Sequence, residues 1–162
     1  MARRVFFSFH YDEDIWRANQ VRNCWLTQPD HKSAGFFDAS LWEASKRSGE
    51  DAIKRMIREG LEGTSVTAIL VGANTAGRTY IDYEIEQSNN VRGNGILAIY
   101  INGLKDKSGY TSARGRNPLD TWTFNDSGKK FSEVYPTYDW VRDEGYKNCG
   151  TWFHRAAQQA GK

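Results

Sequence analysis

Uninterrupted apolar runs along the chain predict strands that are covered on both faces. The runs at 5–9, 65–72 and 95–101 lack the alternation of a half-exposed strand. The short stretch GFFDAS, residues 35–40, predicts one more strand after the first run. We therefore expect four strands, of which the three apolar runs are buried.

The segments between these strands carry apolar residues three or four positions apart, which is typical of amphipathic helices. They predict helices over 13–26, 48–63 and 78–93, the first capped by Asp12 or Asp14. Strands and helices thus alternate along the chain. This order favours an α/β fold in which a mostly parallel sheet carries helices on both faces.

The last third of the chain is less regular. We interpret 102–120 as a solvated basic loop, and 121–135 predicts a hairpin around a four-residue turn, 125–128. Residues 138–162 predict one or two closing helices. No repeat or linker interrupts the pattern, so we expect a single domain, 1–162, with a C-terminal hairpin and helix extension.

Composition narrows the classes of function. Of 162 residues, 39% are hydrophobic and 26% charged, and the net charge of +2 is too small to favour nucleic acid or an anionic membrane as a partner. Cys24 and Cys149 show no CxxC spacing, which favours reduced thiols. No run has the length of a membrane span or the character of a signal peptide. We expect a cytoplasmic protein.

Familiar catalytic and phosphate-binding motifs are missing from the sequence. It contains no GxGxxG, no GxxxxGK[ST], no HExxH and no nucleophile elbow. The three histidines have no metal-like spacing, so we expect no metal site. Chemistry at the carboxyl edge of the sheet, where ligands of such folds gather, would have to rest on carboxylates and aromatic rings.

Glu84 is the carboxylate that the pattern favours. It lies near the start of a predicted helix, on one face with Tyr80, Tyr83 and Gln87. An acidic residue near a helix N-terminus is also favourable without any function. Spacing alone leaves both interpretations open.

Two segments resemble Toll/interleukin-1 receptor (TIR) domains. RVFFSFHYDED is similar to their first box, and RTYIDYEIEQS resembles the segment S-x-W-C-x-x-E, whose glutamate is catalytic in NAD-consuming members. On that alignment Tyr80 takes the tryptophan position, Ile81 the cysteine position and Glu84 the catalytic position. Tyr80 in place of tryptophan and Ile81 in place of cysteine are departures from the family pattern.

The similarity is greater to the TIR-like family that includes the B protein of the bacterial Thoeris antiphage system. It spans Arg4 to about Trp152 and rests on the ordered segments RVFFSFHY, VRNCW, FDASLWE, GLEGTSVTAILVG, YEI and VYPTYDWVRDEGY. The resemblance implies a flavodoxin-like TIR fold, with NAD+ as substrate and no further cofactor. It also implies a cyclic ADP-ribose-type product that activates a separate effector, a homo-oligomer and a phage component as the trigger.

On this interpretation Glu84 is the catalytic residue, because one carboxylate suffices to stabilise an oxocarbenium-like state when the leaving group is already cationic. Residues near the two strand ends and on the same helix are expected to contact the substrate, by stacking or by hydrogen bonds; they are Ser8, Phe9, His10, Asp38, Ser40, Trp42, Tyr80 and Tyr83.

The acidic run Asp12–Asp14 is unfavourable for binding a pyrophosphate, and we expect these side chains to cap the first helix and to point away from the site. Two other functions remain open from the residues. One is a non-catalytic TIR-like module that self-associates or docks another protein, and the other is a nucleotide sensor without turnover.

Overall fold

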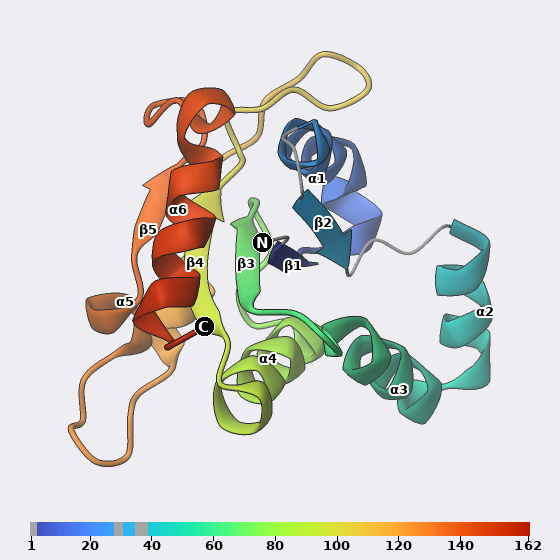
Figure 1. Cartoon of the computed structure of the whole chain (residues 1–162). Coiled ribbons are helices and arrows are strands. Elements are labelled where there is room, and N and C mark those ends of the chain that lie inside the picture. Colours follow the sequence, from blue (N-terminus) through green and yellow to red (C-terminus); the bar gives the residue numbers. More distant parts are fainter. Residues whose placement is uncertain (1–2, 28–30, 35–38) are drawn as a thin grey trace.

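The central element of the protein is a parallel sheet of five strands. The structure is a computed structural model that describes residues 3–27, 31–34 and 39–162, without the side chains of 31–34 and 39–43. The strand order is β2-β1-β3-β4-β5, and every neighbouring pair is parallel (Figure 1). The strands are β1 (Arg3–Ser8), β2 (His31–Ala34), β3 (Val66–Val71), β4 (Gly95–Tyr100) and β5 (Thr137–Asp139).

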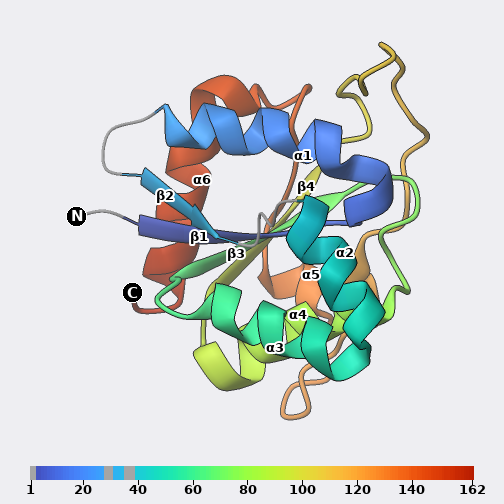
Figure 2. The ribbon, with the colours of Figure 1, turned by 90° about the vertical axis from the view of Figure 1, so that its right-hand side faces the viewer.

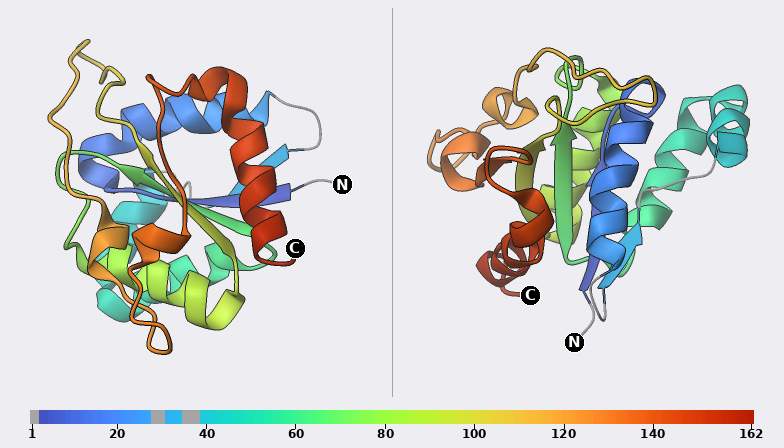
Figure 3. Two further views of the ribbon diagram at one scale, coloured as in Figure 1. Left: turned by 90° about the vertical axis from the view of Figure 1, so that its left-hand side faces the viewer. Right: turned by 90° about the horizontal axis from the view of Figure 1, so that it is seen from above.

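Helices cover both faces of this sheet. Helices α1 and α6 lie on one face, and α3, α4 and α5 on the other (Figures 2 and 3). Helix α2 packs on the outside of α3. The helices are α1 (Tyr11–Leu26), α2 (Ala39–Ser48), α3 (Glu50–Leu61), α4 (Thr79–Glu86), the π-helix η1 (Gln87–Arg92), the 3₁₀ turn η2 (Pro118–Thr121), α5 (Phe131–Val134) and α6 (Gly145–Gln159).

Strand β1 shows how the sequence determines these layers. Its side chains alternate between the faces of the sheet, so Val5 and Phe7 pack in the core beneath α1 and α6. Phe6 packs on the opposite face with α3. Ser8 follows Phe6 by two positions and therefore faces the α3–α4 side, although it is polar and fully buried.

The predicted α/β class, parallel sheet and flavodoxin-like order are confirmed. The apolar runs form β1, β3 and β4, and the helical spacings form α1, α3 and the pair α4–η1. None of the helices in the described residues combines the length and apolar character that crossing a bilayer requires.

Three local predictions were wrong, and a fourth is only partly tested. The structure has a second strand at His31–Ala34, whereas the predicted one, 35–40, lies outside the described residues at 35–38 and begins α2 at 39–40. The N-cap of α1 is His10, so Asp12 and Asp14 belong to its first turn. The hairpin over 121–135 is reduced to one bridge, Thr123 with Lys130, followed by α5. The segment expected to begin the closing helices first adds the edge strand β5.

Candidate functional site

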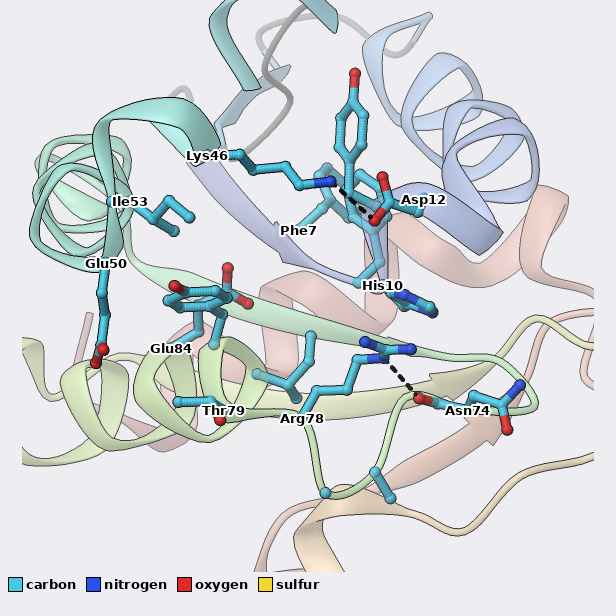
Figure 4. Close-up of a pocket in the computed structure, with 17 residues that line it drawn as sticks. Phe7, His10, Asp12, Lys46, Glu50, Ile53, Asn74, Arg78, Thr79 and Glu84 are labelled. Carbon is cyan, nitrogen blue, oxygen red and sulfur yellow. Dashed lines mark hydrogen bonds and ion pairs between the residues drawn. The ribbon is translucent and has the colours of Figure 1, made fainter. Parts of the chain in front are cut away.

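A cavity of about 720 Å³ opens at the carboxyl end of β1 (Figure 4). Its walls come from residues within 7–12, 46–53 and 74–84. In the sheet, β1 lies between β2 and β3, so the chain reverses its direction of winding at this point. Ligands of open α/β sheets bind at such a switch point, and the cavity therefore has the position of a binding site.

Glu84 forms the inner end of the cavity. Ile81 and Ile85 anchor α4 on the sheet, and Glu84 is held between this helix and β1 with only 8% of its surface exposed. The Ser8 hydroxyl donates a hydrogen bond to Glu84 Oε2. Burial raises the pKa of Glu84 from 4.5 to about 8, although the hydrogen bond from Ser8 acts in the opposite direction.

Ser8 was expected to contact a ligand directly. It is fully buried and is absent from the cavity lining, so the hydroxyl lies behind Glu84. The position follows from the alternation along β1, which turns Ser8 toward α4 at the last residue of the strand.

Aromatic rings line the cavity beside Glu84. Phe9 and Tyr11 stack on each other, with ring centroids 5.9 Å apart and an interplanar angle of 26°. Tyr80 lines the cavity one helical turn before Glu84. These flat surfaces suit a heteroaromatic ligand.

Tyr83, expected on the same helical face, lies outside the cavity lining. Its hydroxyl accepts a hydrogen bond from Arg58 Nη1 at 2.8 Å, and Lys54 Nζ lies 5.3 Å from the ring centroid. Tyr83 therefore joins α4 to α3 instead of facing a ligand.

His10, which is expected to contact a substrate, lines the cavity and belongs to a hydrogen-bonded network. Its Nδ1 lies 3.1 Å from Glu13 Oε2, and Asn74 Nδ2 donates to Glu13 Oε1 at 2.9 Å. Burial acts to raise the pKa of Glu13, but the hydrogen bonds with Asn74 and His10, together with the charges of His10 and Arg78, lower that pKa overall. The network ties the start of α1 to the loop between β3 and α4.

The acidic run Asp12–Asp14 does not point away from the cavity as a whole, as was expected. Asp12 lines the cavity, which contradicts the prediction that these acids point away. Its Oδ2 lies 3.5 Å from Lys46 Nζ on α2, across the mouth of the cavity (Figure 4). Asp12 thus adds negative charge at the mouth, and Lys46 compensates it.

Asp14 is turned into the core, where its Oδ1 pairs with Arg17 at 3.2 Å. Its other oxygen has no hydrogen-bond partner among the described residues and packs against Gly72, where a Cβ would lie 2.1 Å away. Burial raises the pKa of Asp14. His10, Glu13 and Asp14 have ligand-type atoms within 4.8 Å of one another, a cluster that a search for histidine spacing overlooks. Its members already pair with Arg17 and Asn74.

Three expected site residues are left without a described side chain. Asp38 lies outside the described residues, and the side chains of Ser40 and Trp42 on α2 are not described either. Sequence reasoning missed the cavity residues Lys46 and Arg78. The available signal for Arg78 was the Gly-containing stretch GANTAGR, which follows the buried strand β3 at the carboxyl edge.

The arrangement combines a buried carboxylate, stacked rings and a mouth with charges of both signs. A carboxylate in a buried site that excludes water stabilises a positive charge that develops close to it. The rings and the cations suit a ligand that is flat in one part and anionic in another.

Two comparisons with known proteins show similarity to one family. A family model described as "Thoeris protein ThsB, TIR-like domain" matches residues 6–106. A protein of Bacillus cereus (strain MSX-D12), named as a candidate cyclic ADP-D-ribose synthase, ThsB1, is 38% identical over 191 aligned positions. The alignment covers 94% of this chain and 99% of the relative.

Proposed function

Because the chain belongs to the TIR-like domain family of the Thoeris protein ThsB, we propose that it cleaves the nicotinamide–ribose bond of NAD+ and releases a cyclic ADP-ribose-type product. The observation that carries the proposal is the position of Glu84. This carboxylate is buried at the inner end of the switch-point cavity. The resemblance of RTYIDYEIEQS to the TIR segment gives it the place of the catalytic glutamate.

The reaction begins with heterolysis of the bond between the ribose C1′ and the nicotinamide nitrogen. The bonding electron pair goes to the pyridinium nitrogen, which becomes neutral as nicotinamide leaves, so no general acid is required. The ribosyl group acquires oxocarbenium character, as in glycoside hydrolysis. The Glu84 carboxylate stabilises this positive charge, and Tyr80 and Phe9 stack on the bases.

The charge state of Glu84 couples substrate binding to activation. With a pKa of about 8 the free protein holds Glu84 largely protonated at neutral pH. A bound pyridinium cation lowers that pKa, because an opposite charge nearby favours the ionised form. NAD+ therefore promotes formation of the carboxylate that its own cleavage needs.

A nucleophile of the same molecule then uses its lone pair to form a bond to C1′ and closes the ring, and the proton that it loses passes to solvent. Attack by water, with the same loss of a proton, would give linear ADP-ribose. The proposal includes a diffusible product that activates a separate effector in antiphage defence. It also includes a homo-oligomer, a phage component as trigger and a cytoplasmic location, because product and effector must share one compartment. These features are supported by the family resemblance.

The test is nicotinamide release from NAD+ by the purified protein, measured for wild type, Glu84→Gln and Glu86→Gln. Glu86 is the matched control, because it lies on the same helix and is exposed. We expect Glu84→Gln to reduce the rate by about 10²–10³-fold, as for the loss of one transition-state-stabilising group. Glu86→Gln should retain the wild-type rate.

If the purified wild type is silent, the same variants are compared by nucleotide product in lysates of infected cells. Product in wild type and its loss in Glu84→Gln supports the assignment. Equal product from both proteins would exclude Glu84 as the catalytic group, and no product from either would leave an interaction domain as the better function.

A further inference from the structure

The middle of the cavity contains an arginine that is fixed on one side and open on the other. Arg78 occupies the N-cap position of α4, and its Nε donates to the carbonyl oxygen of Asn74 at 3.1 Å. Its guanidinium points into the cavity between Glu84 and His10 (Figure 4). In the described part of the chain, its two terminal nitrogens have no hydrogen-bond partner.

The loop that carries Arg78 is held in place on its other side. Asn74 Nδ2 donates to both carboxylate oxygens of Glu13, at 2.9 and 3.2 Å. A guanidinium held through Nε presents its remaining N–H groups as a fork that matches two phosphate oxygens. The fork is thus oriented before any ligand binds, and less side-chain freedom is lost on binding.

A second cation reaches the cavity from the opposite wall. Lys46 extends from α2 to Asp12 at a distance of 3.5 Å, in an ion pair with 40% and 55% of the two side chains exposed. Such exposed pairs contribute little stability, so a ligand anion competes with Asp12 for the ammonium group at small cost. Lys46 and Arg78 therefore face the same space from α2 and from α4.

The start of α4 adds a weaker attraction for anions. The first hydrogen bond of this helix runs from Asp82 N to Arg78 O, so the amides of residues 79–81 precede it. These N–H groups and the helix dipole give the N-terminus partial positive charge. Thr79 and Tyr80 line the cavity at this point.

We propose that Arg78, assisted by Lys46, forms a diphosphate-binding subsite midway between Glu84 and His10. The inference rests on the proposed function in so far as NAD+ supplies the diphosphate. The subsite separates the two halves of the dinucleotide, so that the nicotinamide riboside lies beside Glu84 and the adenosine lies toward His10. It also places two cations beside Asp12. The other carboxylates that line the cavity are Glu84, which accepts a hydrogen bond from Ser8, and Glu50, which pairs with Lys54 at 2.9 Å.

The experiment measures binding of ADP and of adenosine by calorimetry at low and moderate salt. ADP contains the diphosphate and lacks the nicotinamide bond, so its binding does not depend on turnover. We expect Arg78→Gln to weaken ADP binding roughly tenfold, to reduce its salt dependence and to leave adenosine binding unchanged. Arg155→Gln is the matched control, because Arg155 is exposed on α6, across the sheet.

A variant with the opposite expectation tests the charge argument. Asp12→Asn removes the carboxylate that competes for Lys46, and we expect it to tighten ADP binding about threefold. Arg78→Lys retains the charge without the fork and should fall between wild type and Arg78→Gln. Circular dichroism verifies that each variant is folded.

The proposal is overturned if wild type does not bind ADP, if Arg78→Gln affects ADP and adenosine equally, or if it matches the Arg155→Gln control. Failure of the catalytic proposal gives a different result: nicotinamide release is absent while ADP binding still depends on Arg78. A normal Glu84-dependent rate with Arg78-independent ADP binding would instead remove only the subsite.

Discussion

The two ends of the cavity differ in the solvent exposure and in the partners of their carboxyl groups. At the inner end Glu84 is 8% exposed, and burial raises its pKa to about 8. At the mouth the side chain of Asp12 is 55% exposed, and its carboxylate faces Lys46. Both groups line the same cavity, so the contrast comes from solvent access and partners, and not from residue type.

The contrast indicates which end supports chemistry and which supports binding. An unpaired charge in a site that excludes water has a high free-energy cost, but it interacts strongly with an opposite charge that forms beside it. Charges in a wet mouth interact weakly and are screened by salt, which suits exchange of a substrate anion. The following predictions test this division, beginning with the largest effect.

Replacing Glu84 should change how stability depends on pH. The pKa of Glu84 in the folded protein, about 8, lies above its usual value of 4.5. Between these values the folded state holds a proton that the unfolded state has lost, so the free energy of unfolding falls as pH rises. From pH 5.5 to 8.5 this contribution amounts to about 3 kcal/mol, and Glu84→Gln should abolish it.

Urea unfolding of wild type, Glu84→Gln and Glu86→Gln at the two pH values measures the effect. The control should retain the wild-type decrease, because Glu86 is exposed. Asp14, whose pKa is also raised, contributes equally to all three proteins. If the free energy of unfolding changed equally with pH in wild type and in Glu84→Gln, the inner end of the cavity would be accessible to water.

Removing the Ser8 hydroxyl should shift the pH dependence of activity. The ionised form of Glu84 is the active one, so kcat/KM should rise with pH up to about 8. Ser8 donates to this carboxylate and favours its ionisation. We expect Ser8→Ala to move the acid limb up by about one pH unit and to lower kcat/KM at pH 7 about tenfold.

Nicotinamide release across pH 6–9 gives this profile. Ser132→Ala, the same substitution on α5, should leave the acid limb of the kcat/KM profile at the wild-type pH. A Ser8→Ala protein that loses activity equally at every pH would contradict the positioning of Glu84 by this hydrogen bond.

The strands that could be predicted from the sequence are those buried on both faces, because burial on both faces requires a continuous run of apolar residues. Strands β1, β3 and β4 are central and read as apolar runs, and α3 buries Ile53, Ile57 and Leu61 at helical spacing. Within the described residues, strand β2 pairs with β1 alone, at the edge of the sheet. An edge strand does not need an apolar run, so the sequence HKSA gives no strand signal, and the apolar residues GFF that follow it lie outside the described residues.

The candidate site divides in the same way. Glu84 and the end of β1 could be predicted, because the family motif and the topology both point to that edge. Arg78 and Lys46 could not, because they reach the cavity from elements far apart in sequence. The direction of Asp12 was also wrong: a residue in the first turn of a helix has no apolar period that fixes its side chain.

The smallest predicted effect concerns the ion pair at the mouth. The Asp12 and Lys46 side chains are 55% and 40% exposed, so we expect a coupling free energy of about 0.2–1 kcal/mol from the double-mutant cycle of Asp12→Asn and Lys46→Gln. Because the Debye length falls to about 3 Å at 1 M salt, the coupling should vanish there. Thermal or urea unfolding of the four proteins at low and high salt measures it. A salt-independent coupling above about 2 kcal/mol would mean that the mouth is as shielded from water as the inner end, and that a diphosphate could not displace Asp12 from Lys46 at small cost.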